Sequence, residues 1–181
     1  MEEKIYITNY ISPFGNLFLA QFQHQLCLCD WENRPSSKRI FLRISKFLKS
    51  DFLWKSTSFL SEVSSQLDQY FDGNLKSFDI PLLLTGTDFQ NKVWKHLQNI
   101  PYGQSMSYQI FTNQYFHQNA IRAVATANGA NILSIIIPCH RVIGSDGSMT
   151  GYAGGLSAKE GLLRLEGVIP KSWQLDLFHV T

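Results

Sequence analysis

The chain has 181 residues, of which 44% are hydrophobic and 17% are charged, and its formal net charge is +2 at pH 7. Its length suits one sizeable domain or two small ones, and the apolar fraction excludes an intrinsically disordered protein. The small net charge excludes a partner that is held by overall charge alone, so any basic surface must be local.

Cysteine usage and the lack of long apolar runs indicate the compartment. The three cysteines, two of them at Cys27 and Cys29, do not make a disulfide framework and are typical of a reducing environment. No stretch approaches the roughly 18 consecutive apolar residues of a membrane span. The start Met1-Glu2-Glu3-Lys4 lacks the basic and then apolar layout of a signal peptide. We therefore expect a soluble, cytoplasmic protein with no membrane partner.

The first half of the chain, up to residue 84, indicates an α/β scaffold. Short apolar runs between turn residues predict strands, and apolar residues at helical spacing predict helices. The alternation of Phe78, Ile80, Leu82 and Leu84 predicts a further strand. The predicted strands are 5–10, 17–22, 25–31 and 78–84, and the predicted helices are 36–49 and 57–72.

The second half contains a predicted helix-turn-helix. Thr87 and Gln90 form a capping box, and the helix that it opens ends before Pro101. A short helix over 107–114 is followed by the decamer 120–129, whose side chains are small almost throughout. Such a helix can approach a sugar-phosphate backbone closely, in the minor groove as readily as in the major groove. The alternative is a tightly packed core helix, which alanines also favour.

The run Ile135-Ile136-Ile137-Pro138-Cys139-His140-Arg141 is the most informative part of the sequence. The three branched residues predict a buried strand that the proline ends. Positive neighbours lower the pKa of a cysteine, and the thiolate is the reactive form, so this is where a nucleophile would be made. The alternative is a core cysteine at the end of a strand.

The segment after the cysteine carries turn and helix signals. Residues 144–147 predict a turn, and 151–155 predict a flexible glycine-rich loop. Ser157 and Glu160 have the spacing of a second capping box, which predicts a helix that ends at Glu166. Glu166 is either a surface carboxylate or the partner of a histidine.

Taken together, these motifs resemble one family. The sequence is similar to the C-terminal domain of the O6-alkylguanine-DNA alkyltransferases, the methylated-DNA–protein-cysteine methyltransferases, over residues 86–168. In this family another domain precedes that C-terminal domain, and the first half of the chain is similar to it only in layout. The matching pieces lie in one order at 86–90, 93–94, 100–103, 107–108, 122–124, 127–131, 137–144, 151–156 and 165–167.

This resemblance implies an α/β (α+β) fold with two domains. Residues 1–84 would form a ribonuclease-H-like α/β domain. Residues 85–170 would form a mainly helical, winged-helix-like (helix-turn-helix) domain that binds DNA and accepts the alkyl group, and 171–181 would be a tail. The implied function is DNA repair: a flipped O6-alkylguanine, with O4-alkylthymine as an alternative substrate, loses its alkyl group irreversibly to Cys139.

The resemblance also implies catalytic roles. Cys139 would be the acceptor, and His140 would take the thiol proton through a water while Glu166 orients the imidazole. Asn131 matches the hinge asparagine that ties the helix-turn-helix to the active-site segment. Arg122 would fill the gap left by the flipped nucleotide, and Tyr108 would rotate a phosphate and donate to N3 of the guanine.

Further residues are implied in two groups. Small or polar residues of the second helix would contact DNA, and residues around the glycine-rich loop and the cysteine would wall the substrate pocket. The first group is Ala123, Ala127, Asn128 and Gly129; the second is Tyr152, Ala153, Gly154, Val142 and Ser134.

Metal and cofactor requirements are expected to be absent. His24, Cys27 and Cys29 cluster near the N-terminus, but a fourth ligand at suitable spacing is not evident, and structural zinc normally takes four. We expect no cofactor, and a monomer whose partner is double-stranded DNA that contains alkylated guanine. Two alternatives are an alkyltransferase-like protein that only binds lesions, against which Cys139 argues, and a cysteine hydrolase, which needs an oxyanion hole.

Overall fold

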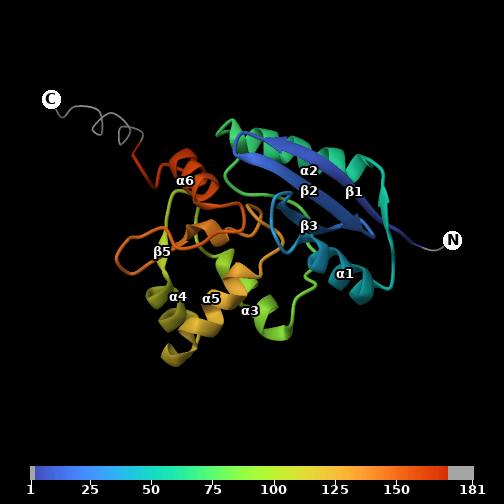
Figure 1. The fold of residues 1–181 in the computed structure, drawn as a ribbon. Coiled ribbons are helices and arrows are strands. Elements are labelled where there is room, and N and C mark those ends of the chain that lie inside the picture. Colours follow the sequence, from blue (N-terminus) through green and yellow to red (C-terminus); the bar gives the residue numbers. More distant parts are fainter. Residues whose placement is uncertain (1–2, 171–181) are drawn as a thin grey trace.

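The computed structural model describes residues 3–170 as a mixed α/β protein (Figure 1). The N-terminal half is a four-stranded sheet in the order β3-β2-β1-β4, where β1 and β2, and β2 and β3, are antiparallel and β1 and β4 are parallel. The strands are β1 Ile5–Ser12, β2 Gly15–Phe22, β3 Gln25–Trp31 and β4 Phe52–Trp54. The three long strands confirm the prediction, whereas β4 has only three residues and was not predicted.

Two helices accompany this sheet, at the places that the apolar spacing predicted. They are α1 Ser37–Leu48 and α2 Ser58–Phe71. In α1, Ile40 and Ile44 are buried, and Phe41 contacts the ring of Phe18 in β2. Thr57 is the N-cap of helix α2, and its side chain accepts a hydrogen bond from the backbone of Leu60.

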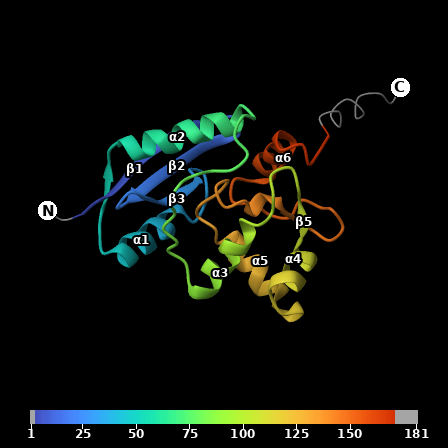
Figure 2. The same cartoon turned by 180° about the vertical axis from the view of Figure 1, so that it is seen from behind.

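The C-terminal half is mainly helical and forms the other end of the molecule in both views (Figures 1 and 2). The predicted capping box of Thr87 and Gln90 is present at the start of α3. Trp94 of α3 is buried and donates through Nε1 to the backbone oxygen of Ala127 in α5. The elements are α3 Asp88–Leu97, β5 Met106–Ser107, α4 Tyr108–Tyr115, η1 Gln118–Ala120, α5 Ile121–Gly129, η2 Cys139–Arg141, β6 Val142–Ile143 and α6 Leu156–Leu165.

Strand β3 joins the two halves along its outer edge. Leu26 exchanges backbone hydrogen bonds with residues 81 and 83, and Cys29 does so with Ile132 and Ser134. Two irregular segments therefore cover an edge that would otherwise expose unpaired backbone groups. One cluster of buried side chains runs through both halves, so the sheet and the helices share a hydrophobic core.

These edge contacts correct two strand predictions. Residues 78–84 form only an isolated bridge, at Leu82, because a single short contact with β3 satisfies this extended segment. Residues 135–137 are buried, but Ile135 and Ile136 lie in a turn and Ile137 forms only an isolated bridge with Ser134. Ile135 has a φ of +73°, which is unfavourable for a β-branched residue. The chain reverses here so that it can leave β3 and deliver Cys139 to the C-terminal half.

The second predicted capping box is also wrong. Helix α6 begins at Leu156, with Gly155 at its N-cap and no side-chain cap hydrogen bond. Gly155 has a φ of +85°, a conformation that glycine adopts without strain. Glu160 pairs with Arg164 one turn later instead of with the start of the helix. The predicted tail 171–181 lies outside the described residues.

Candidate active site

Cys139 lies at the start of η2, directly after Pro138, and is 3% exposed. Its sulfur accepts a hydrogen bond from Nδ2 of Asn131 over 3.1 Å. Asn131 is itself buried, donates to the backbone oxygen of Ile137 over 3.0 Å and accepts from the backbone of Leu133 over 3.0 Å. The asparagine therefore ties the end of the α5 region to the segment that carries the thiol.

A buried polar cluster follows the cysteine. His140 Nε2 lies 2.9 Å from Glu166 Oε1, so Glu166 is the partner of a histidine and not a surface carboxylate. Arg141 donates to the same carboxylate, through Nε to Oε2 over 2.8 Å and through Nη2 to Oε1 over 2.9 Å. The hydroxyl of Tyr70 donates to Oε1 over 2.7 Å. Burial alone would raise the pKa of Glu166, but the hydrogen bonds from His140 and Arg141 outweigh it and lower the pKa to about 2.

This cluster fixes the proton on the imidazole. Glu166 is ionised at neutral pH and can only accept, so His140 must donate to it through Nε2. Burial lowers the pKa of His140, and the Glu166 hydrogen bond only partly offsets that effect. The neutral ring then carries its lone pair on Nδ1, which is buried and has no hydrogen-bond partner among the described residues. A basic nitrogen is thus left free next to the cysteine in sequence.

The predicted low pKa of the thiol is wrong for this resting structure. Burial raises the pKa of Cys139, and the hydrogen bond from Asn131 offsets only part of the rise. Adjacent sequence suggested positive neighbours, but the Arg141 guanidinium is bound to Glu166 and His140 is neutral. The thiol is therefore held protonated until a base removes its proton.

Lys159 belongs to the site and was not singled out by the sequence analysis. It is fully buried in α6, and its Nζ donates to the backbone oxygens of Val142 over 2.7 Å and Thr150 over 3.2 Å. Burial lowers its pKa to about 8. Lys159 shares the buried side of α6 with Leu162 and Leu163, and this helical spacing was the available signal. It connects strand β6 to Thr150, the residue just before the glycine-rich loop.

The second helix of the helix-turn-helix presents only part of its predicted DNA-contacting set. Arg122, Ala123 and Gly129 are exposed. A pocket of about 420 Å³ opens beside them, and Tyr108 forms part of its wall. The remaining lining residues are Ile121, Arg122, Ala125, Gly129, Thr150 and Gly151.

Ala127 and Asn128 face the interior, which corrects their placement on the DNA face. Both are buried, because this side of α5 packs on α3 and on the cysteine segment. Nδ2 of Asn128 donates to the hydroxyl of Tyr108 over 2.8 Å and lies 3.5 Å from the backbone oxygen of Cys139. Asn128 therefore links the pocket wall to the nucleophile.

Four of the predicted substrate-pocket residues lie in two places: three lie near His140 and Trp31, and Val142 lies next to Lys159. Tyr152 has its ring in edge contact with His140, with centroids 6.3 Å apart, and Gly154 packs so closely on Trp31 that an added Cβ would lie 2.5 Å from the indole. Ala153 is half-buried beside them, and Val142 is buried with its backbone oxygen occupied by Lys159.

Ser134 is corrected. Its side chain is fully buried and donates to Asp30 of β3 over 3.3 Å, and it does not line the pocket beside Arg122. The reason is the reversal of the chain after β3, which places Ser134 on the strand edge and carries only the residues after it toward the thiol.

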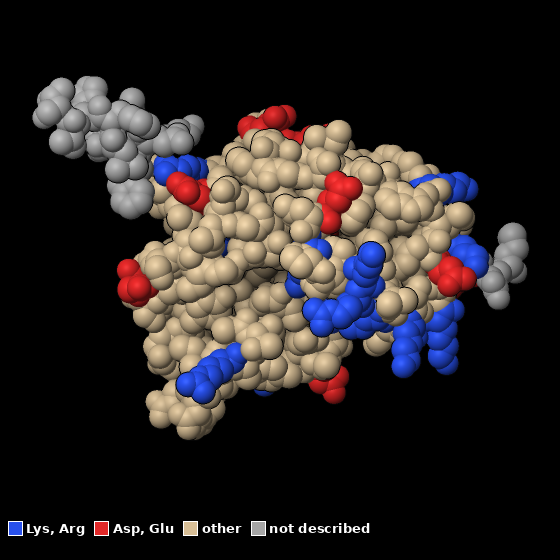
Figure 3. Space-filling view, in the orientation of Figure 1, with Lys and Arg blue, Asp and Glu red and all other residues tan. Residues whose placement is uncertain are grey.

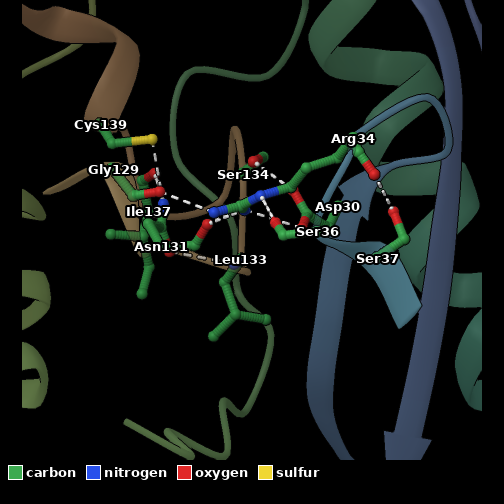
Figure 4. Close-up of polar contacts among 10 residues, drawn as sticks. All are labelled: Asp30, Arg34, Ser36, Ser37, Gly129, Asn131, Leu133, Ser134, Ile137 and Cys139. Carbon is green, nitrogen blue, oxygen red and sulfur yellow. Dashed lines mark hydrogen bonds and ion pairs between the residues drawn. The ribbon is translucent and has the colours of Figure 1, made fainter. Parts of the chain in front are cut away.

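Arg34, which follows β3, clamps the end of α5 (Figure 4). Its guanidinium donates to the backbone oxygens of Gly129 over 2.6 Å and Asn131 over 2.7 Å, and it forms an ion pair with Asp30 at 2.8 Å. Burial raises the pKa of Asp30, and the charge of Arg34 opposes that effect. The contacts span 95 and 97 positions of sequence, so no local motif could reveal them.

A local basic surface is present on the N-terminal half. Figure 3 shows Lys and Arg gathered over α1, a helix that has no acidic residue. Arg39 and Arg43 of this helix and Ala130 after α5 line a common groove of about 260 Å³. The groove thus adjoins the end of the helix that carries Arg122.

The N-terminal residues that were weighed as metal ligands differ in their exposure. His24 is exposed, whereas Cys27 and Cys29 are buried, and burial raises the pKa of Cys27 to about 12. No group of three or more potential ligands gathers anywhere in residues 3–170. Over the same range, every helix is too short or too polar to traverse a bilayer.

Comparison with known proteins places this site in a family. Residues 5–84 match the ribonuclease-like domain of 6-O-methylguanine DNA methyltransferase, and residues 88–168 match its DNA-binding domain. The methylated-DNA–protein-cysteine methyltransferase of Methanosarcina barkeri is 44% identical over 156 residues, which cover 86% of this chain and 92% of the relative. The protein of the same name from Shigella flexneri is 42% identical over 171 residues, covering 93% and 96%.

Solved structures agree. The crystal structure of Mycobacterium tuberculosis OGT in complex with DNA has a TM-score of 0.77 and 40% identity, and the match covers 90% of this chain and 92% of that one. The M. tuberculosis O6-methylguanine methyltransferase structure gives a TM-score of 0.74 and 38% identity, covering 97% and 99%. This chain belongs to the 6-O-methylguanine DNA methyltransferase family.

Proposed function

We propose that this protein repairs DNA by transferring the alkyl group of O6-alkylguanine irreversibly to the sulfur of Cys139. The observation that carries the proposal is a buried thiol, held by Asn131, next to a histidine whose Nε2 is committed to Glu166 and whose Nδ1 is free. The names of the relatives, which describe methyl transfer from methylated DNA to a protein cysteine, support the same reaction.

The reaction begins with proton removal. Nδ1 of His140 takes the thiol proton, with a water as the carrier, and the imidazolium that forms is stabilised by Glu166 at 2.9 Å. Because the carboxylate is also bound to Arg141, it stays ionised and fixed in orientation throughout. The amide of Asn131 donates to the sulfur and stabilises the negative charge that develops there.

The thiolate then displaces the base. A bond forms between Sγ and the alkyl carbon while the bond between that carbon and O6 breaks, and the electron pair of the broken bond passes to the guanine. Tyr108 donates toward N3 of the base as the charge develops, and the proton removed from the thiol is the one that the guanine anion finally regains. The product is a thioether, which has no leaving group for a second cycle, so each molecule acts once.

Access to a base in a duplex requires its extrusion, which costs a few kcal/mol. Arg122 is exposed beside the pocket of about 420 Å³ and is placed to fill the gap in the stack. Asn128 connects Tyr108 in the pocket wall to the backbone of Cys139, so an everted base would meet the phenol and the thiol together. We take the partner to be duplex DNA with alkylated guanine, bound by a monomer in the cytoplasm.

This function divides the chain into two domains with different tasks. Residues 85–170 supply the acceptor, the base and the DNA-facing helix, and residues 1–84 supply the sheet that supports them. The β3 edge and Arg34 are the support: they hold Asn131 and the end of α5 in place.

The test is the stoichiometry of methyl loss from a duplex with O6-methylguanine in excess over protein. The proposal expects one methyl lost per protein molecule and no further turnover. Cys139→Ala should abolish the loss and keep DNA binding, whereas the matched control Cys27→Ala, which alters a buried thiol in β3, should keep both. Binding without methyl loss would favour a lesion-binding protein, and continued turnover would favour a hydrolase.

A further inference from the structure

Tyr70 is a residue of the N-terminal half that reaches the carboxylate of the proposed relay. It lies in α2 with its side chain fully buried, and its hydroxyl donates to Glu166 Oε1 over 2.7 Å across 96 positions of sequence. Its ring packs against Phe78 and against Tyr102 of the C-terminal half. The hydroxyl is thus held at one place by packing from both halves.

Oxygen Oε1 of Glu166 is shared among several donors. Tyr70 approaches it at 2.7 Å, and His140 Nε2 and Arg141 Nη2 each approach it at 2.9 Å, whereas Oε2 takes the Nε of Arg141 at 2.8 Å. A carboxylate oxygen offers about two lone-pair sites, so three donors must divide them. Removing or strengthening one of these hydrogen bonds therefore alters the strength of the other two.

Tyr70 is a neutral and permanent donor. Burial and the charge of Glu166 raise the pKa of its phenol well above the usual value, so it keeps its proton at every pH at which the protein works. The hydroxyl withdraws electron density from Oε1 without adding a positive charge, unlike Arg141. It thereby weakens the attraction of the Glu166 carboxylate for a proton on the His140 imidazole, without changing the net charge of the cluster.

We propose that Tyr70 is a positioning residue of the transfer reaction: by competing with His140 for Oε1 of Glu166, its hydroxyl keeps the imidazole neutral and ready to accept the thiol proton. The inference rests on the proposed function. It gives the N-terminal half a part in the chemistry in addition to its support of the fold.

Several other charged and titratable groups surround His140 and influence its protonation. Glu166 attracts a proton to the imidazole, and Arg141 and Lys159 repel one. Tyr152 presents its ring edge-on to His140, and Tyr102 lies near enough to Glu166 to sense its charge. Lys159, with a pKa of about 8, is charged across the acidic range, so its charge stays constant while the effect of a change at Tyr70 is measured at His140.

The experiment compares Tyr70→Phe with wild-type protein by two readouts. One is the titration midpoint of His140 in the free protein, followed by NMR of labelled histidine, and the other is the acid limb of the single-turnover rate. Loss of a hydrogen bond to a charged group should raise both midpoints by about one pH unit. The rate at mildly acidic pH should fall correspondingly, because protonated His140 cannot act as a base.

The matched control is Tyr10→Phe. Tyr10 also donates its hydroxyl to a carboxylate on α2, Asp68 at 2.8 Å, and stacks on Phe71, but it does not touch Glu166. This variant removes a phenol hydroxyl from strand β1 that also hydrogen-bonds a carboxylate, and it should leave both midpoints unchanged. An equal shift in both variants would overturn the proposal, because it would reflect general loosening.

A second substitution reverses the expected sign. Placing 3-fluorotyrosine at position 70 makes the phenol a stronger donor, so both midpoints should fall. Because this form keeps the buried hydroxyl and its hydrogen bond, it remains available as a test if Tyr70→Phe does not fold. If both midpoints stay unchanged in Tyr70→Phe and in the 3-fluorotyrosine protein, Tyr70 only packs in the core and the proposal is wrong. The His140 titration is read without DNA, so a shifted titration in a protein that transfers no alkyl group would contradict the proposed function and leave the Tyr70 contact standing.

Discussion

Replacement of Asn131 by aspartate tests how the thiol is activated. In the native protein Nδ2 of Asn131 donates to the sulfur of Cys139 over 3.1 Å, and Oδ1 accepts from the backbone of Leu133 over 3.0 Å. Aspartate keeps the shape of the side chain and the acceptor for Leu133, but it presents an oxygen to the sulfur in place of a donor. The substitution therefore removes the stabilisation of the thiolate with little change of volume.

The size of the effect follows from two contributions. A hydrogen bond to a charged group is worth roughly 1.5–3 kcal/mol, and about 1.4 kcal/mol is a factor of ten in rate, so transfer should slow roughly 10- to 100-fold. An ionised aspartate at this position would add repulsion of about 4 kcal/mol for charges 4 Å apart at an effective dielectric constant near 20. A buried carboxyl that takes up a proton escapes this repulsion and offers its O–H to the sulfur, so the loss of transfer belongs to the ionised form and should grow as the pH rises.

Two measurements check this prediction. The single-turnover rate on a duplex with O6-methylguanine gives the loss of transfer, and peptide mapping after iodoacetamide treatment at a series of pH values gives the titration midpoint of Cys139 separately from Cys27 and Cys29. The midpoint should rise by about one to two pH units. Asn74→Asp, which adds the same formal charge at an exposed position, is the control. If the Asn131 variant transfers at the wild-type rate with an unshifted midpoint, the asparagine does not stabilise the thiolate.

Three further predictions concern DNA access, the clamp between the halves and the buried carboxylate. Arg122→Ala should slow transfer from duplex DNA far more than from free O6-alkylated guanine, because only the duplex needs a residue in the gap; equal losses on both substrates would remove that role. Arg34→Met should lower the free energy of unfolding by about 3–5 kcal/mol in urea denaturation, because it leaves the buried Asp30 carboxylate without its positively charged partner. The pKa of Asp30, already raised, should rise further, so the deficit should be larger at neutral pH than at acidic pH. Glu166→Gln should lose about 3 kcal/mol of stability at neutral pH, since the pKa of Glu166 falls from 4.5 to about 2 on folding; this contribution is present above pH 4.5 and is lost as the pH falls toward 2, so the two proteins should converge there.

Local patterns were sufficient for most of the secondary structure. The alternation in β1 to β3, the spacing of Ile40 and Ile44 in α1 and the capping box at Thr87 each depend on neighbours within a few residues, and the structure has all of them. The failures lie where the backbone takes its partners from far away. The run 135–137 has a strand-like composition, but the edge of β3 pairs with the residues just before it and forces Ile135 into a turn with positive φ.

The candidate site divides in the same way. Cys139 and His140 are adjacent in sequence, and the resemblance pointed to Asn131 and Glu166. Arg34 and Tyr70 could not be found from the sequence because their importance comes from contacts more than 90 positions away. The raised pKa of Cys139 was also out of reach, since burial, which no local motif reports, decides it.

The most direct measurement locates the methyl group after reaction with a duplex that carries O6-methylguanine, by tandem mass spectrometry of the digested protein. We predict S-methylcysteine at position 139, in an amount equal to the methyl lost from DNA, and unmodified Cys27 and Cys29. Methyl loss from the DNA with Cys139 unmodified would contradict it.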